Sequence, residues 1–217
     1  MSTPSSTANN SALPSPAAPL LIGDHPALDF LNSILSLAGL PIDFLETGSS
    51  LAIWMPAAKI LPDRVAQSLV TFTPEQKEVL AARVRELREY FRALLVKRQQ
   101  THEAGAVPLQ DNDIGFLNDF LRTAPLVQQL CMEDGAVKLL ALRDLSKPVS
   151  VIAEIATLCA DLLANHPIEQ VRKCENPACT MWFNDAKRGP KRRWCSMALC
   201  GNRAKVAAHR ARLKNDA

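Results

Sequence analysis

Hydrophobic residues recur at helical spacing along most of this chain. Between residues 26 and 38, leucine, isoleucine and alanine positions lie three or four apart, which predicts an amphipathic helix that ends near Gly39. Shorter apolar runs predict a helix over 50–62, interrupted at Pro56, and another over 62–69. The N-terminal part is therefore expected to be helical.

The clearest predicted helix begins at Thr73. Thr73 and Gln76 have the spacing of a capping box, with Pro74 at the first helical position. The apolar residues that follow repeat at intervals of four and three: Leu80, Val84, Leu87, Phe91 and Leu94. This stripe predicts a helix that runs to about Gln100 with one face in the core.

After a predicted loop at 101–109, the pattern indicates a hairpin between two further helices. Apolar residues from Ile114 to Leu121 predict the first helix, and those from Ile152 to Leu163 predict the second. Between them, two short strands flank Asp134-Gly135, a dipeptide that favours a two-residue turn. The predicted fold class of this region is mostly α (α+β), with one β-hairpin.

Composition divides the 217 residues into three parts. Residues 1–19 are mostly Ser, Thr, Pro, Ala and Asn without charge, which predicts a disordered tail. Residues 20–171 hold the helical domain, and 172–217 form a small second domain. Because no Lys or Arg precedes Lys59 and no apolar run approaches the roughly 20 residues of a membrane span, a cytoplasmic protein is expected.

The charge is unevenly distributed, although the net charge is only +3. Residues 172–217 contain twelve Lys and Arg against three Asp and Glu, whereas the preceding residues contain thirteen against nineteen. An acidic body with a basic end predicts an anionic partner for that end, above all nucleic acid.

Four cysteines form two pairs inside the basic segment. Four residues separate Cys174 from Cys179 and Cys195 from Cys200, and fifteen lie between the pairs. This spacing predicts one structural zinc ion bound by four thiolates, with no open position for catalysis. A segment this short has too small a core to fold alone, and zinc contributes roughly 10–16 kcal/mol in isolated fingers. The alternatives are two disulfides, or a site in which His209 replaces one cysteine.

The other cysteines and histidines suggest no chemistry. Cys131 and Cys159 lie on apolar faces and are expected to be buried, inert thiols. His25, His102 and His166 each stand alone, without a neighbouring catalytic partner. Since no phosphate-binding glycine loop or nucleophile elbow is present in the sequence, no enzymatic activity is expected.

A treble-clef-like arrangement is predicted around the zinc. Strands at 180–184 and 191–195 would meet at Gly189-Pro190, and Ser196 would cap a helix that carries Cys200 in its first turn. The metal would hold this helix rigid while its cations face an anion. The residues expected to bind nucleic acid are Arg188, Lys191, Arg192, Arg193, Arg203, Lys205, Arg210, Arg212 and Lys214.

Two stretches resemble known families. CSMALCGNRAK resembles the CGNR zinc finger, whose motif stands here at Cys200 to Arg203. LLIGDHPALDFLNS resembles the start of the ABATE domain, which commonly precedes that finger in bacteria. The resemblance implies a stress-induced transcriptional regulator whose four cysteines bind zinc and whose finger binds DNA.

Three residues of the ABATE-like region are candidates for a small-molecule pocket: Asp29, Asn32 and Trp54. Asp29 and Asn32 are three residues apart on the first predicted helix, as polar residues beside an apolar stripe. Alternatively, they cap or hydrogen-bond the neighbouring backbone.

The expected function is thus a zinc-dependent, DNA-binding transcriptional regulator with an N-terminal effector-sensing or dimerisation domain. Its expected partners are duplex DNA, a small-molecule effector and a second copy of the chain, but no membrane. Two other classes remain open. In an RNA- or ribosome-associated factor, Trp182, Phe183 and Trp194 would stack on unpaired bases; in a protein-interaction module, zinc would stabilise a binding surface.

Overall fold

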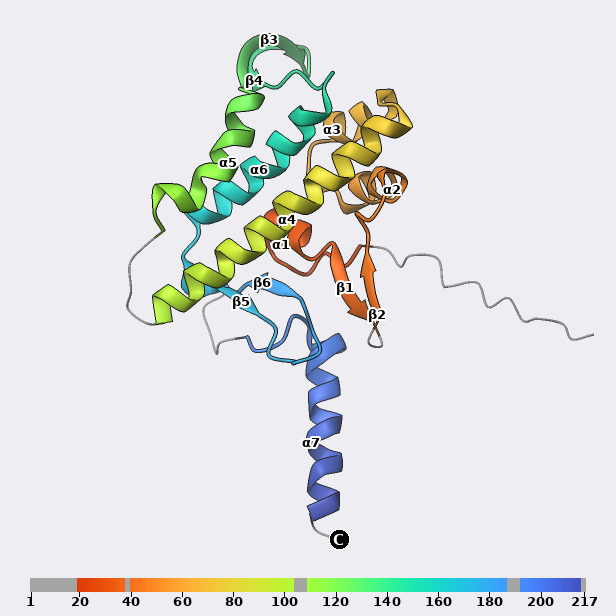
Figure 1. Ribbon diagram of the computed structural model, residues 1–217, viewed down its shortest axis with the longest axis vertical. Helices are drawn as coiled ribbons and strands as arrows, with labels where there is room; N and C mark the ends of the chain where they lie inside the picture. The colour runs from red at the N-terminus through yellow and green to blue at the C-terminus, as the bar shows by residue number, and fades with distance from the viewer. Residues whose placement is uncertain (1–18, 38–39, 104–108, 187–191, 216–217) are drawn as a thin grey trace, which may run out of the picture.

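The computed structural model describes residues 19–37, 40–103, 109–186 and 192–215 (Figure 1). The predicted tail at 1–19 lies outside these ranges except for its last residue. The first elements are α1 (Pro26–Leu31), β1 (Ile34–Leu37), β2 (Leu40–Asp43), α2 (Gly48–Ala58), α3 (Asp63–Ser68) and the 3₁₀ turn η1 (Leu69–Thr71). The long helix α4 (Pro74–Glu103) follows.

The helix predicted over 26–38 is wrong beyond Leu31. α1 ends there, and β1 pairs antiparallel with β2, which adds a hairpin that the sequence pattern did not predict. The polar side chains after α1 explain this ending. Asn32 and Ser33 are buried and bond to groups far away in the sequence, Trp182 and Arg88, so tertiary contacts outweigh the helical spacing of the leucines.

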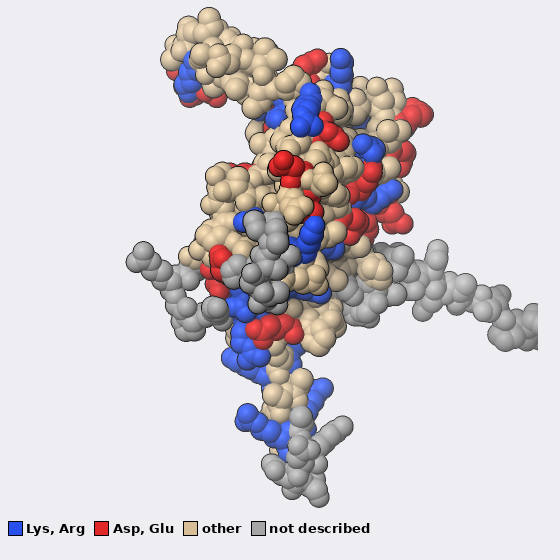
Figure 2. All heavy atoms as spheres, turned by 60° about the vertical axis from the view of Figure 1, so that its left-hand side comes forward, with Lys and Arg blue, Asp and Glu red and all other residues tan. Residues whose placement is uncertain are grey.

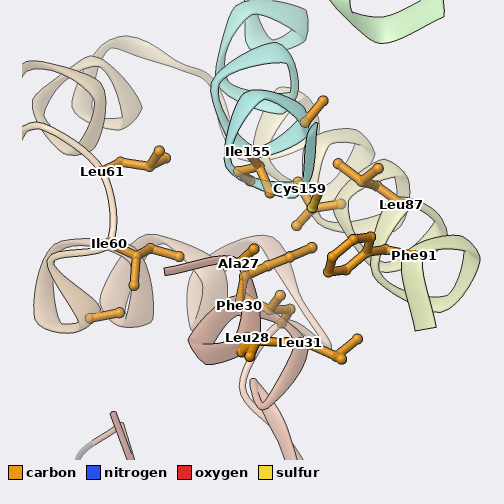
Figure 3. Close-up of a cluster of buried hydrophobic side chains, with 14 of the residues drawn as sticks. Ala27, Leu28, Phe30, Leu31, Ile60, Leu61, Leu87, Phe91, Ile155 and Cys159 are labelled. Atoms are coloured by element: carbon orange, nitrogen blue, oxygen red, sulfur yellow. The ribbon is translucent and has the colours of Figure 1, made fainter. Parts of the chain in front are cut away.

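α4 follows its prediction closely. The Thr73 backbone N–H donates to Gln76 Oε1 at 2.9 Å and the Gln76 N–H donates to Thr73 Oγ1 at 3.3 Å, which completes the capping box. All five residues of the predicted stripe are buried. Figure 3 shows Leu87 and Phe91 of α4 meeting Phe30 of α1 and Ile155 of the later helix α6, where the core lies.

The second half of the body is two helices joined by a hairpin: α5 (Asp111–Thr123), β3 (Val127–Glu133), β4 (Ala136–Leu142) and α6 (Pro148–Asn165). Asp134 and Gly135 both have positive φ, 54° and 76°, as the predicted two-residue turn requires. Cys159 is buried as expected, whereas Cys131 is only half-buried because its strand is largely exposed. α6 is long and apolar enough to span a membrane, but half of it is buried in this fold, as in a core helix.

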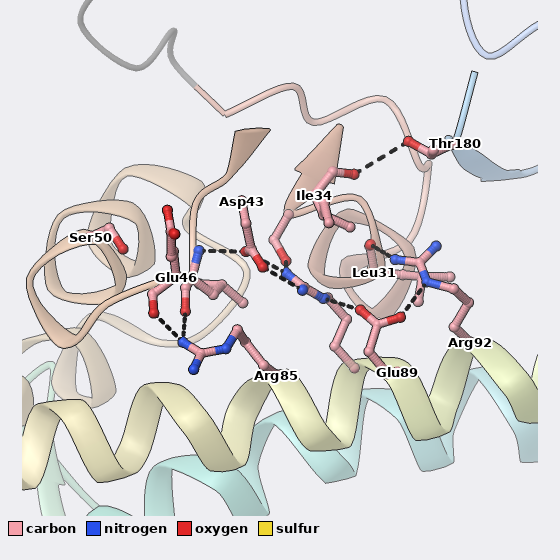
Figure 4. Close-up of polar contacts among 12 residues, drawn as sticks. Leu31, Ile34, Asp43, Glu46, Ser50, Arg85, Glu89, Arg92 and Thr180 are labelled. Carbon is pink, nitrogen blue, oxygen red and sulfur yellow. Dashed lines mark hydrogen bonds and ion pairs between the residues drawn. The ribbon is translucent and has the colours of Figure 1, made fainter. Parts of the chain in front are cut away.

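A buried ion pair attaches the β1–β2 hairpin to α4 (Figure 4). Arg88 is 2% exposed and donates to both carboxylate oxygens of Asp43 at 2.7 Å, and also to Ser33 Oγ at 3.0 Å. Burial raises the pKa of Asp43, but the hydrogen bonds from Arg88 and the Leu45 N–H, together with the charges of Arg88 and Arg85, outweigh it and leave that pKa below its usual value. Arg92 adds a bond from α4 to the Leu31 carbonyl.

The C-terminal part begins where α6 ends. Its elements are the 3₁₀ turn η2 (Ile168–Gln170), β5 (Val171–Lys173), β6 (Trp182–Asn184), the π-helical turn η3 (Met197–Gly201) and α7 (Asn202–Asn215). β6 pairs antiparallel with β5. The prediction that 180–184 pairs with 191–195 is therefore wrong. The strand that pairs with β6 is β5, which lies directly before Cys174.

Candidate metal centre and basic helix

The fold brings the four predicted zinc ligands together. Cys174 follows β5, Cys179 precedes β6, Cys195 precedes η3, and Cys200 lies in η3. Their sulfur atoms all lie within 4.8 Å of one another, and three of the four residues are buried. A strand hairpin with a cysteine loop, followed by a helical turn carrying the last ligand, is a small zinc-finger arrangement.

The sulfur positions suit a tetrahedral zinc ion. Four Zn–S bonds of about 2.3 Å place neighbouring sulfurs about 3.8 Å apart. Cys179 Sγ lies 3.8 Å from Cys195 Sγ, and Cys195 Sγ lies 3.6 Å from Cys200 Sγ. These separations are much longer than a disulfide bond of about 2.05 Å, and all four cysteines are free. His209 is exposed on α7, outside this cluster, so the set of donors is four thiols.

Packing the thiols together separates their pKa values. A hydrogen bond from Cys195 lowers the pKa of Cys179 to about 5. The same contact raises the pKa of Cys195, and burial raises the pKa of Cys200. The negative charge of Cys179 raises both further, because it would repel a second thiolate. A divalent cation at the centre would remove that repulsion, so the donor chemistry fits zinc.

Donors around the sulfurs complete the centre. The Cys195 backbone N–H donates to Cys174 Sγ at 3.4 Å, and Asn176 Nδ2 donates to Cys200 Sγ at 3.4 Å. Asn176 also folds its own loop, since its Oδ1 accepts from the Ala178 N–H at 3.1 Å. Asn176 is not among the residues predicted from the sequence. The signal for it was Asn176-Pro177 inside the first cysteine pair, a dipeptide typical of tight turns.

The finger is attached to the body through Asn32. Asn32 Nδ2 donates to the Trp182 carbonyl at 2.8 Å, and Asn32 Oδ1 accepts from the Trp182 N–H at 2.9 Å, so this side chain pairs with β6 as a neighbouring strand would. Trp182 and Phe183 are 2% and 0% exposed and belong to the same hydrophobic cluster as the core of the body. The finger and the body thus share one core.

The three pocket candidates do not converge on a cavity. Asp29 accepts a hydrogen bond from the Gly23 N–H at 2.8 Å, and Asn32 is occupied by Trp182. Trp54 is buried in the core of the body. Asp29 and Asn32 therefore follow the alternative interpretation, in which they hydrogen-bond backbone groups.

Arg192 is bound inside the protein. Its guanidinium contacts Asp24 and the carbonyls of Trp194 and Cys195, and it stacks on the Phe183 ring at 4.3 Å. These contacts fix the finger to the residues before α1, so this side chain is not free to bind a phosphate. Its predicted role in nucleic-acid binding is replaced by a structural one.

The other predicted basic residues differ in their surroundings. Arg193 pairs with Glu175 at 2.6 Å, yet 63% of its side chain is exposed. Arg188 and Lys191 lie outside the described residues, and Lys214 lies in α7 with a side chain that the structure does not describe. The cations of α7 that the structure describes as exposed are Arg203, Lys205, Arg210 and Arg212. Figure 2 shows Lys and Arg gathered on the finger and along this helix.

A histidine pair joins α1, α6 and the finger. His25 Nδ1 accepts the Ala27 N–H at 3.1 Å and thereby caps α1, so the proton of the neutral ring lies on Nε2, 3.2 Å from Asp161 Oδ2. The His166 ring packs against His25 at 4.6 Å and contacts Asn184 of β6. Both His25 nitrogens take part in hydrogen bonds, so this cluster is a hydrogen-bonded junction between the three parts of the chain.

We expect this junction to weaken the protein in acid. Burial lowers the pKa of His25 more than its bond to Asp161 raises it, so between the ordinary pKa of 6.5 and the lower folded value the unfolded chain binds the proton more readily. The free energy of unfolding should therefore fall as pH drops below about 6.5. His25→Asn keeps a capping oxygen but cannot titrate, and urea melts at several pH values should show a shallower decline for this variant. An unchanged decline would contradict the assignment.

Comparison with protein families agrees with both halves of this structure. A family model described as "CGNR zinc finger" matches residues 170–213. A second, ABATE, described as "Putative stress-induced transcription regulator", matches residues 24–166. No curated protein matches the chain.

Proposed function

Since this chain belongs to the ABATE family, whose model covers most of it, and ends in a CGNR zinc finger, we propose that it is a zinc-dependent regulator of transcription that binds duplex DNA through α7 and the basic face of the finger. The observation that supports the proposal most directly is the exposure of α7 to solvent. Every residue from Lys205 to Arg210 is exposed, so the helix extends from the finger without a protein layer over it (Figure 1).

The dimensions and charge of α7 suit a DNA groove. Fourteen helical residues span about 21 Å, and an α-helix fits the major groove, which is about 12 Å wide. The exposed cations of α7 are available for phosphates, and the largely exposed Arg193 adds a cation on the finger. Phosphate contacts of this kind supply affinity and fix the orientation of a helix on the duplex.

Aromatic burial favours duplex DNA over unpaired RNA. Base stacking needs open ring faces, but Trp182 and Phe183 are fully enclosed in the shared core. Trp194 is half-buried and carries the Arg193 guanidinium over its ring at 5.1 Å. The rings that would serve a single-strand binder are thus used for packing.

Zinc would be held by Cys174, Cys179, Cys195 and Cys200, and when bound it supplies rigidity at the base of α7. In this proposal the chain is not an enzyme, because four thiolates leave no position for a metal-bound water. It acts in the cytoplasm, where thiols stay reduced. The ABATE domain serves as an effector-sensing or dimerisation unit.

The direct test is binding of a labelled duplex at several salt concentrations. Wild-type protein should bind with an affinity that falls steeply as salt rises, with a log–log slope of about −0.9 for each phosphate that is neutralised. Replacing Arg203, Lys205, Arg210 and Arg212 with alanine should weaken binding and flatten the slope by about one for each phosphate that the variant no longer neutralises.

A control variant that loses the same number of cations elsewhere distinguishes a DNA-binding site on α7 from a general effect of net charge. Lys59, Lys97, Arg122 and Lys147 are equally numerous exposed cations on the body, and their replacement should leave the slope unchanged. Binding that is independent of salt, or equally weakened by both variants, would contradict the proposal. Stronger competition by unpaired RNA than by the same duplex would favour the RNA-binding class instead.

A further inference from the structure

The β3–β4 hairpin leaves the body at the end opposite α7 (Figure 1). In its register, Leu130 pairs with Leu139 and Met132 with Val137, so these four side chains share one face of the ribbon. They are 60–74% exposed. Ionisable groups of the ribbon lie elsewhere: Lys138 pairs with Glu133 on the other face and with Asp134 in the turn. Figure 2 shows the hairpin as a largely uncharged lobe.

Such a face needs a covering layer. A two-stranded ribbon alone is marginally stable in water, and monomers rarely expose this many large apolar side chains together. An uncharged face also forms no ion pairs with a partner, so electrostatic attraction cannot select that partner. The layer that covers it must therefore be apolar and shaped to receive aliphatic side chains.

The body contains such a receptor beside the base of the hairpin. Helices α4, α5 and α6 form an open groove of about 280 Å³. Its floor and walls are mostly apolar, with Val79, Phe116, Phe120, Val149 and Ile152 among them, and its charged lining residues are Arg83 and Asp119. Since a cavity of about 150 Å³ admits a benzene ring, the groove has room for about two aliphatic side chains. The hairpin does not fill the groove of its own chain, because its four apolar side chains remain exposed.

We propose that the hairpin of one copy docks in the α4–α5–α6 groove of a second copy, and that the exchange is reciprocal in a two-fold homodimer. Each chain carries both the arm and the receptor, and both lie at the same end of the body. A two-fold axis therefore forms two identical contacts at once, which a partner lacking either half could not do.

The area agrees with a stable dimer. Burying a Leu or Val side chain removes about 100 Å² from water, so four of them hide about 400 Å² on each arm. They hide a similar area on the partner, where the groove takes two of the side chains and the surface around it covers the other two. Two such contacts bury about 1,600 Å² in total, the standard size of a specific interface. One contact alone would reach only half of that area.

The test measures the mass of the full-length, zinc-loaded protein in solution by light scattering and sedimentation over a dilution series. Wild-type protein should have the mass of two chains. An arm variant, Leu130→Glu with Leu139→Glu, and a receptor variant, Val79→Glu, should each raise the dimer dissociation constant about 30-fold or more. Val70 is 81% exposed on η1, outside both surfaces, so Val70→Glu should leave the dimer intact.

Mixing the variants tests the arm-to-groove geometry. The arm variant keeps its receptor and the receptor variant keeps its arm, so an equimolar mixture should regain one of the two contacts and form more dimer than either alone. Failure to regain any dimer would overturn the groove assignment in favour of arms that stack on each other. A wild-type monomer, a dimer that survives the arm variant, or a ladder of larger species would each overturn the proposal.

The mass measurement is independent of DNA binding. The arm lies far from α7, so an arm variant should keep its zinc and its affinity for a duplex per chain even as a monomer (Figure 1). Failure of the dimer with intact DNA binding, or the reverse, identifies which of the two proposals is wrong. Unchanged circular dichroism and zinc content would show that each variant is folded.

Discussion

Replacing Cys200 with serine should abolish stoichiometric zinc binding and unfold the finger together with α7. Metal contributes on the order of 10 kcal/mol to isolated fingers, and a hydroxyl is a poor substitute for the thiolate that closes this tetrahedron. Because η3 carries Cys200 and leads directly into α7, loss of the metal should also abolish duplex binding. Metal analysis, circular dichroism and a DNA titration on the same sample would measure all three effects.

The control is a cysteine outside the centre. Cys131 is half-buried on β3, and Cys131→Ser should keep one zinc per chain and full DNA binding. Chelation of the wild-type protein should reproduce the Cys200→Ser phenotype, and added zinc should reverse it. Retention of one tightly bound zinc by Cys200→Ser would show that this thiol is not a ligand.

Replacing Asp43 with alanine should destabilise the body by about 3 kcal/mol, the lower end of the cost of breaking a buried pair, because the buried Arg88 guanidinium then keeps only the half-exposed Glu89 as a counter-charge. The variant should lower the urea midpoint without changing the denaturant dependence of the unfolding free energy. Zinc content should persist, since the ion pair lies on α4 and the β1–β2 hairpin and not in the finger.

Two comparisons isolate the cause. Asp119 pairs with Arg122 on the surface, both more than 70% exposed, so Asp119→Ala should cost less than about 1 kcal/mol. Replacing Asp43 and Arg88 together with leucine and methionine should recover much of the loss, since neither charge is then buried alone. If Asp43→Ala costs no more than Asp119→Ala, burial does not strengthen this pair.

Local patterns predicted the elements whose own residues determine them. The capping box at Thr73, the stripe on α4 and the turn at Asp134-Gly135 involve neighbours a few positions apart, and all three are confirmed. The end of α1 depends instead on Asn32, whose partner Trp182 is 150 residues away. The partner of β6 was missed for a different reason: β5 is near β6 in sequence, but it lies at the predicted boundary between the two domains, before the first cysteine.

In the candidate site, too, the sequence predicted what depends on local spacing and missed what depends on contacts across the fold. Cysteine spacing was sufficient to predict that these four thiols come together in a cluster that suits zinc, because a tetrahedral ion restricts the spacing of its donors. It could not predict the fate of Arg192, which resembles its basic neighbours in sequence but bonds to Asp24 across the fold. Net charge indicates how many cations a segment carries, whereas only the packing shows which of them remain free.

The shared core of finger and body has a consequence for anyone who would cut or recombine this protein. Trp182 and Phe183 belong to the same hydrophobic cluster as residues of α1 and α4, so cutting the chain near residue 171 would divide one hydrophobic core between two fragments. In the isolated finger, the side chains of Trp182 and Phe183 would become exposed to water. The isolated body would lose β6, which hydrogen-bonds to Asn32. The finger is therefore not an independent domain. If it were fused to another protein, it would fold only together with the part of the ABATE domain against which it packs.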